Sequence, residues 1–134
     1  MKLKDISVQY IAGDSIYIIG TRRSICDFVE ILQNGLVENA DLDPPKDTYP
    51  GAIEIVQIQI RSSDDKVLFT VEGNSLIIQG SLEMRSLASL SIMHLCEPPV
   101  SGMLNSDHSH LDAFDDHPFL DSASWPVVVS LAEH

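Results

Sequence analysis

The chain has 134 residues, enough for one domain, and its 44% of hydrophobic residues excludes a disordered chain. Its net charge of −12 at pH 7 excludes nucleic acid and anionic membranes as partners, because both bind through Lys and Arg. No stretch approaches the roughly 18 apolar residues of a membrane span, and the start has no signal-peptide core, so we expect a cytoplasmic protein.

Two segments sixty residues apart have similar sequences. VQYIAGDSIYIIGT at 8–21 and LFTVEGNSLIIQGS at 68–81 share seven identical or similar residues in fourteen, without a gap. Each segment is typical of a β-hairpin around Gly-Asp or Gly-Asn, because glycine readily adopts the positive φ of a type II′ turn. The sequence therefore predicts an internal repeat.

A two-residue turn fixes which residues face each other across each hairpin. The pairs predicted on the core face are Ile11 with Ile16, Gln9 with Ile18, Val71 with Leu76, and Phe69 with Ile78. On the opposite face of the first hairpin, Tyr10 and Tyr17 are predicted to pair.

A helix is predicted after each hairpin, with Thr21 and Ser81 as N-caps. The first helix is expected to end at Asn34-Gly35 and the second before Pro98-Pro99. The predicted apolar faces are Ile25, Phe28, Val29 and Leu32 in the first helix, and Met84, Leu87, Leu90 and Leu95 in the second.

A further strand closes each unit. At 52–60 the apolar positions change phase between Ile55 and Val56, which predicts a β-bulge or a strand buried on both faces. The counterpart is WPVVVSLA at 125–132, where Pro126 indicates the start of a strand or a sheet edge.

These elements predict an α+β fold. We expect one domain, 1–134, built by tandem duplication of a β-hairpin–helix–strand unit, with copies at 1–62 and 63–134. Two helices would pack on one face of a mixed or antiparallel sheet. Between helix and last strand, we align Leu42-Asp43 with Leu111-Asp112.

The two cysteines, Cys26 and Cys96, have no CxxC partner. A cytoplasmic chain is kept reduced, so we expect buried or half-buried thiols rather than a disulfide. No nucleophile, phosphate-loop or zinc-protease motif occurs in the sequence. We therefore expect no cofactor and no enzymatic activity.

The last third of the chain is strongly acidic. Residues 86–134 contain seven Asp and Glu, no Lys or Arg, and all five His. Such a segment attracts a basic partner, and aromatic residues within it can act as anchors. The predicted partner-binding residues are Asp107, His108, His110, Asp112, Phe114, Asp115, Asp116, His117 and Asp121.

A metal site is the alternative interpretation of this segment. On a strand, His108, His110 and Asp112 share one face, and two imidazoles with a carboxylate can bind a metal. The chain would then be a small metal-binding protein or metalloenzyme. A merely solvated strand face is the third interpretation.

HSHLDAFDDHPFLDSASWPVVVSL, at 108–131, resembles the C-terminal segment of bacterial polymorphic-toxin immunity proteins, most closely the immunity protein 32 family. The resemblance extends over about 67–131. It implies a non-enzymatic intracellular protein that binds one cognate toxin through the toxin's basic surface and blocks it; many such toxins are nucleases. A homodimer formed through an exposed hairpin edge is a further alternative.

Overall fold

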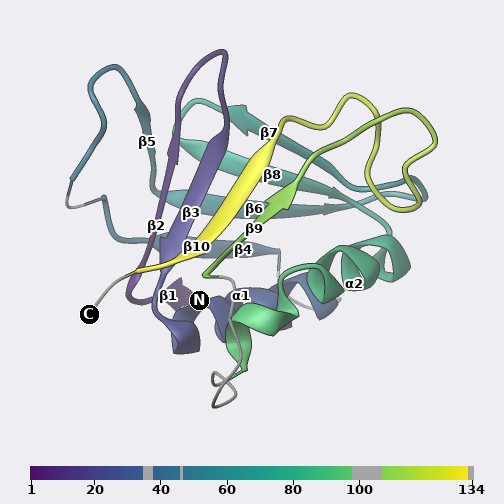
Figure 1. Cartoon of the computed structure of the whole chain (residues 1–134), viewed down its shortest axis with the longest axis horizontal. Coiled ribbons are helices and arrows are strands. Elements are labelled where there is room, and N and C mark those ends of the chain that lie inside the picture. The colour runs from purple at the N-terminus through teal and green to yellow at the C-terminus, as the bar shows by residue number, and fades with distance from the viewer. Residues whose placement is uncertain (35–37, 46, 98–106, 133–134) are drawn as a thin grey trace.

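The computed structural model describes residues 1–34, 38–45, 47–97 and 107–132. The elements in chain order are β1 (Lys2–Leu3), β2 (Ile6–Tyr10), β3 (Ile16–Gly20), α1 (Arg22–Gln33), β4 (Asn39–Leu42), β5 (Ile53–Ile55), β6 (Gln57–Ser62), β7 (Leu68–Glu72), β8 (Ser75–Gly80), α2 (Leu82–Leu90), the short 3₁₀ helix η1 (Met93–Cys96), β9 (His108–Leu111) and β10 (Val127–Leu131). The fold is α+β, as predicted (Figure 1). None of the helices in these residues has the length and apolar character needed to cross a bilayer.

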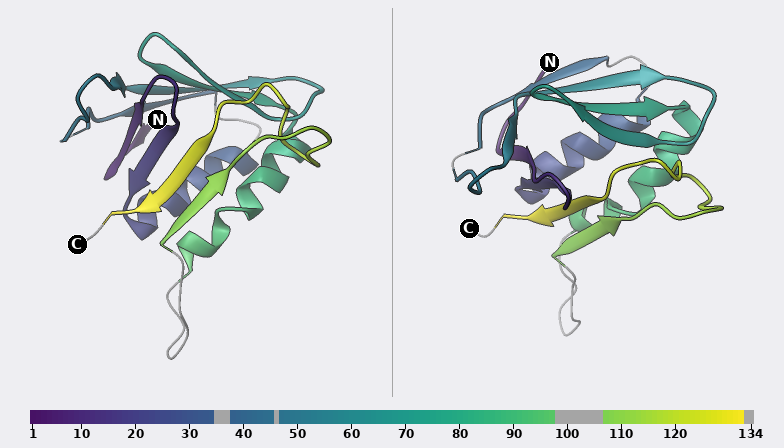
Figure 2. Two further views of the ribbon diagram at one scale, coloured as in Figure 1. Left: turned by 45° about the horizontal axis from the view of Figure 1, so that its top comes forward. Right: turned by 90° about the horizontal axis from the view of Figure 1, so that it is seen from above.

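The strands form two mixed sheets of five strands each. The first sheet has the order β1-β4-β6-β8-β7 and the second the order β5-β2-β3-β10-β9. The two helices contact each other and lie between the sheets (Figure 2). The predicted mixed sheet is therefore divided in two, and α1 packs against both sheets rather than on a single face.

The closing strands of the two units are exchanged between the sheets. β6, from the first unit, pairs in parallel with β8, and β10, from the second unit, pairs in parallel with β3. The order β2-β3-β10-β9 in one sheet thus matches β7-β8-β6-β4 in the other. Duplication of a sequence unit stays a prediction, but neither half can complete its sheet without the other.

The strand registers correct the predicted alignment of the two units. Ala40 lies opposite Ile58 in the first sheet, and Leu111 lies opposite Val127 in the second. Ala40, rather than Leu42, is therefore the counterpart of Leu111. Sequence similarity between these loops is too low to fix the alignment to within two residues.

The second hairpin has the predicted register. Val71 lies opposite Leu76 and Phe69 opposite Ile78, across a two-residue turn. Gly73, the first residue of that turn, has a φ of 60°. This positive φ is the conformation that favours glycine over other residues.

In the first hairpin the predicted register is wrong by one residue. Tyr10 lies opposite Ile16, and the N–H of Ile11 donates to the carbonyl oxygen of Ser15 at 3.1 Å, so the loop contains three residues, 12–14, instead of two. The N–H of Asp14 donates to the carbonyl oxygen of Ile11 at 2.9 Å, and Gly13 has a φ of 78°. Gly13 therefore lies in a longer loop than predicted, and each residue of β3 faces the residue one position earlier in β2 than expected.

The shift separates the two tyrosines that were expected to pair. Tyr10 stacks on Trp125, with ring centroids 4.8 Å apart. Tyr17 lies opposite Gln9. Val8, rather than Gln9, lies opposite Ile18, and Val8 is fully buried.

The phase change between Ile55 and Val56 marks the point where the chain passes from one sheet to the other. β5 ends at Ile55 and pairs with β2, whereas β6 begins at Gln57 and pairs with β4 and β8. A bulge and a doubly buried strand were the predicted explanations, and both are wrong. Ile55 from β5 and Ile58 and Ile60 from β6 belong to the same core, each strand reaching it from a different sheet.

The outer edges of both hairpins have main-chain partners. β2 pairs with β5, and the segment 119–125 forms hydrogen bonds with Phe69 of β7 and with Val67, the residue just before β7. The hairpin edges that were expected to be available for a homodimer are therefore covered at these positions.

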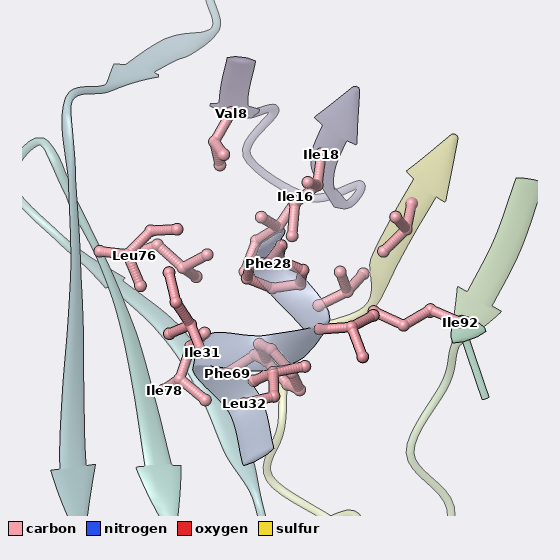
Figure 3. Packing of buried hydrophobic residues seen from close by; sticks show 14 of the residues in the cluster. Val8, Ile16, Ile18, Phe28, Ile31, Leu32, Phe69, Leu76, Ile78 and Ile92 are labelled. Atoms are coloured by element: carbon pink, nitrogen blue, oxygen red, sulfur yellow. The ribbon is translucent and has the colours of Figure 1, made fainter. Parts of the chain in front are cut away.

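α1 forms as predicted. The Thr21 side chain accepts from the N–H of Ser24, and the predicted apolar face is buried. Asn34 at the end of the helix has an extended conformation, while Gly35 and Pro98-Pro99 lie outside the described residues. Figure 3 shows side chains of α1 packed against both sheets: Phe28, Ile31 and Leu32 from the helix, Leu76 and Ile78 from the first sheet, and Val8, Ile16 and Ile18 from the second.

The Ser81 cap of α2 is confirmed, but its predicted apolar face is only half right. Met84 packs against the core and Leu95 is buried, although it lies in η1 rather than in α2. Leu87 and Leu90 are 37% and 58% exposed, whereas Arg85 is only 1% exposed. Ala88 and Ser89 are the other buried residues of this helix. The helix is thus rotated so that an arginine, rather than its leucine row, points into the protein.

Hydrogen bonds from Arg85 explain this rotation. Nη1 donates to the carbonyl oxygens of Leu32 and Asn34, both at 3.3 Å, and Nε donates to that of Gly80 at 3.3 Å. The first two carbonyls lie at the C-terminal end of α1, where a helix has unpaired acceptors and a negative dipole end. Burial lowers the pKa of Arg85, but a guanidinium stays charged.

Arg22 makes a contact of the same kind, but here α1 supplies the arginine, and η1 and the residue after it supply the carbonyl oxygens. Its Nη1 donates to the carbonyl oxygen of Leu95 at 3.1 Å and also to that of Glu97. An arginine at the start of α1 therefore caps the end of η1, while an arginine in α2 caps the end of α1.

We predict that Arg85→Met lowers the free energy of unfolding by about 3 kcal/mol, because the carbonyls of Leu32, Asn34 and Gly80 lose the guanidinium as a donor while most of the side-chain volume is kept. Urea denaturation measures the loss. The matched control is Arg23→Met, an exposed arginine on α1, which should change stability by less than about 0.5 kcal/mol. Equal effects would show that Arg85 is not a structural cap.

Candidate functional site

β9 displays the first part of the acidic segment at the edge of the second sheet. His108, His110 and the following Asp112 are exposed, whereas Leu111 is buried against the core. The predicted alternation of faces is confirmed. Nδ1 of His108 lies 3.0 Å from a carboxylate oxygen of Asp107, and this hydrogen bond lowers the pKa of Asp107.

The metal-site alternative gains no support from this geometry. The rings of His108 and His110 are edge to face, with centroids 5.2 Å apart. Within the described residues, no three His, Cys, Asp or Glu side chains lie close enough together to hold a metal ion. Asp112 shares the face of the two histidines without completing a site.

The acidic loop, residues 112–121, connects the two sheets. It leaves β9 in the second sheet and reaches the edge strand β7 of the first. There the N–H of Val67 donates to the carbonyl oxygen of Phe119, and the N–H of Asp121 donates to that of Val67, both at 2.8 Å. The chain then returns through 122–126 to β10, so the loop is held at both ends (Figure 1).

His117 is the internal anchor of the acidic loop. Its Nδ1 accepts from the N–H of Phe119 at 3.2 Å and from the N–H of Leu120 at 3.0 Å. Its ring packs against Phe114 and Phe119, each with centroids 4.5 Å away. Burial, followed by the charge of Lys66, lowers the pKa of His117, so the neutral imidazole is favoured and both main-chain donors keep their acceptor.

The side chains of the acidic loop surround an open hollow of about 530 Å³. Its lining contains Phe114, Asp115, Asp116, His117 and Asp121 from the predicted set, together with Lys66, Leu120 and Ser122. Phe114 is 58% exposed, an unusual state for so large an apolar side chain. The hollow thus combines an exposed aromatic ring with a rim of carboxylates.

Asp116 occupies a strained position in this rim. It has a φ of 64°, in a turn closed by a 3.2 Å hydrogen bond from the N–H of His117 to the carbonyl oxygen of Phe114. Asp5 is the other non-glycine residue with positive φ in the part of the chain that is described. Aspartate tolerates this conformation better than most residues, but at a cost in stability.

Asp121 differs from its neighbours because its carboxylate is used within the loop. Oδ1 accepts from the N–H of Ala123 at 2.8 Å, and the Asp121 carbonyl accepts from the N–H of Ser124 at 2.9 Å. Asp121 therefore shapes the turn, whereas Asp115 and Asp116 are exposed.

The predicted site residues thus fall into two groups. Asp107, His108, His110 and Asp112 lie along β9, and the five from Phe114 to Asp121 line the hollow. Lys66 was missed, because it lies nearly fifty residues earlier in the chain and only the folded structure brings it to the loop.

Comparison with known proteins identifies no relative of this chain. No protein-family model, no curated protein and no solved structure matches it. The resemblance to immunity proteins therefore stays an expectation, and function is inferred from the acidic loop itself.

We predict that Asp116→Gly raises the free energy of unfolding by up to about 1 kcal/mol, because glycine adopts a positive φ without strain. Chemical denaturation measures the change. Asp115→Gly is the matched control, because the backbone of Asp115 has no positive φ. Glycine there only adds conformational entropy to the unfolded chain, so it should lower the free energy of unfolding by roughly 0.5–1 kcal/mol. Destabilisation by both substitutions would contradict the assigned strain.

We predict that acid destabilises the protein partly through His117. Its folded pKa lies below the ordinary value of 6.5, so between these two values the unfolded chain binds more protons. This contribution to stability is present above about pH 6.5 and is lost as the pH falls through the folded pKa.

The measurement is urea unfolding at about pH 7.5 and about pH 5 for the original chain and for His117→Asn. The Asn side-chain oxygen can replace Nδ1 as an acceptor but does not titrate. The original chain should lose more stability on acidification than the variant. Equal losses would mean that His117 does not carry this pH dependence.

Proposed function

We propose that this chain is a non-enzymatic binding protein that neutralises a cognate bacterial toxin in the cytoplasm, covering a basic surface of the toxin with the acidic loop. The observation that carries the proposal is the pairing of exposed Phe114 with the carboxylates of Asp115 and Asp116 on a loop held at both ends. The family resemblance is in keeping with it.

The fixed position of the acidic loop supports a role in binding. Hydrogen bonds to Val67 hold it to the first sheet, and the imidazole of His117 fills its interior. A loop that is already ordered loses little conformational entropy when a partner binds. Phe114 can then enter an apolar pocket of the partner while the surrounding carboxylates meet Lys or Arg.

The charge of the whole chain supports a basic partner. A net charge of −12 attracts cationic proteins over long range and speeds their association. Nuclease toxins have basic clefts that hold phosphates, and an acidic surface complements such a cleft. The same charge repels nucleic acid and anionic lipid.

The state of His117 favours binding over catalysis. Both main-chain donors point at Nδ1, so that lone pair is engaged in holding the loop. A general base needs a lone pair directed at its substrate. His117 therefore acts as part of the scaffold of the site.

We predict that Asp115→Asn with Asp116→Asn slows association with the toxin domain encoded by the adjacent gene by about tenfold at low salt, because steering charges at the contact are lost. Asparagine keeps the shape of both side chains and tolerates the positive φ at Asp116. Stopped-flow or surface-binding kinetics at two salt concentrations measure the effect, which should shrink at high salt.

The control variant is Glu30→Gln with Glu83→Gln. It removes the same charge from exposed positions on α1 and α2 and should leave the association rate within about twofold. Equal slowing by both variants would show that net charge, not the acidic loop, guides binding. Absence of any complex with the adjacent gene product would rule out the immunity role.

A further inference from the structure

The only two cysteines of the chain meet at the contact between α1 and η1. Cys26 lies in α1 and Cys96 ends η1, with a separation of 70 residues in sequence. The Cys26 thiol donates to the carbonyl oxygen of Cys96, with Sγ 3.6 Å from the oxygen. Both are free and half-buried.

A separate interaction holds the two elements together at this point. The guanidinium of Arg22 donates to the carbonyl oxygens of Leu95 and Glu97, the two neighbours of Cys96 in the chain. The position of Cys96 against α1 therefore does not depend on either sulfur. Replacing one cysteine should leave the other in place.

The environment distinguishes the two thiols. Burial, and next the hydrogen bond and charge of Cys26, raise the pKa of Cys96 to about 12. Cys96 is consequently a poor first nucleophile in water, because only the thiolate attacks a disulfide. The first step of an exchange then belongs to Cys26.

We propose that Cys26 and Cys96 form an intramolecular disulfide when the protein meets a small disulfide oxidant such as oxidised glutathione. This modification site lies outside the acidic loop, and the proposal does not rest on the proposed function. The native fold already holds the Cys26 thiol against the main chain of Cys96.

The reaction is two successive thiol–disulfide exchanges. The Cys26 thiol releases its proton, and the thiolate attacks one sulfur of oxidised glutathione, so that a Cys26–glutathione bond forms and a glutathione thiolate leaves. The Cys96 thiol then gives up its proton to the departed glutathione thiolate or to water. The Cys96 sulfur attacks the Cys26 sulfur, the Cys26–glutathione bond breaks, and the second glutathione leaves as a thiolate that takes up a proton. The protein loses two hydrogens, and one oxidised glutathione is reduced to two thiols.

The bond would tie η1 to the core helix across a long stretch of chain. A cross-link between residues so far apart restricts the unfolded chain strongly and the folded chain little, provided that the native geometry suits it. Oxidation would therefore raise stability. It would also reinforce the contact that Arg22 makes between the same two elements.

The test incubates the purified full chain at about pH 8 with oxidised glutathione, and in parallel with reduced glutathione. We expect the oxidised sample to lose two hydrogens by intact mass, to yield a cross-linked Cys26–Cys96 peptide, and to show no free thiol after denaturation. Its thermal midpoint should rise by roughly 10 °C, and dithiothreitol should reverse every change.

Cys26→Ser and Cys96→Ser are the matched controls. Each should keep the fold and lack the thermal shift. Cys96→Ser should gain one glutathione on Cys26, whereas Cys26→Ser should react far more slowly, because the pKa of Cys96 is raised. The proposal is overturned if the original chain takes up two glutathiones, if it forms only cross-links between molecules, or if both thiols still react after oxidation. A cross-linked product with an unchanged or lower midpoint would also overturn it, because the bond would then not suit the native fold.

Discussion

The carbonyl groups at the end of α1 need hydrogen-bond donors, and the buried guanidinium of Arg85 supplies them. A buried guanidinium is costly to desolvate, and in the described residues no carboxylate lies within ion-pair distance of it. Three carbonyl acceptors and the negative end of the α1 dipole offset that cost. This contact fixes the rotation of α2, which leaves Leu87 and Leu90 exposed. Arg22, at the start of α1, donates in turn to a carbonyl of η1. α1 is therefore joined to α2 near its end and to η1 near its start.

The exchange of closing strands between the sheets determines the position of the acidic loop. Because β9 and β10 belong to the sheet that contains the first hairpin, the chain between them can reach the second hairpin only by crossing the gap between the sheets. It crosses this gap, forms hydrogen bonds with Val67 just before β7, and returns. A loop spanning two sheets is held by two independent surfaces, and this accounts for its order despite its charge. The same exchange gives the two units one shared core.

Local rules of sequence predicted a large part of this structure, and non-local contacts explain the remainder. The caps Thr21 and Ser81, the α1 face and the β9 alternation depend on residues within a few positions of each other. The register of the first hairpin was predicted wrongly because a Gly-Asp pair suits loops of two or three residues. The phase change at Ile55 was visible in the sequence, but only the fold tells a bulge from a change of sheet. The α2 face and Lys66 could not be predicted, because each depends on a partner about fifty residues away.

Charge repulsion within the acidic loop bears on what the loop is for. Asp115, Asp116 and Asp121 surround one hollow, with Lys66 as the cation among its lining residues. Like charges that share one hollow disfavour the folded loop, and the positive φ of Asp116 adds strain. A sequence selected for stability alone would replace Asp115 and Asp116, since their side chains are exposed and, unlike Asp121, do not shape the turn. A cationic partner would relieve the repulsion on binding, so the instability of the free loop would become part of the driving force for association. Features that lower stability without a local compensation are typical of functional sites, and here they coincide with the exposed ring of Phe114.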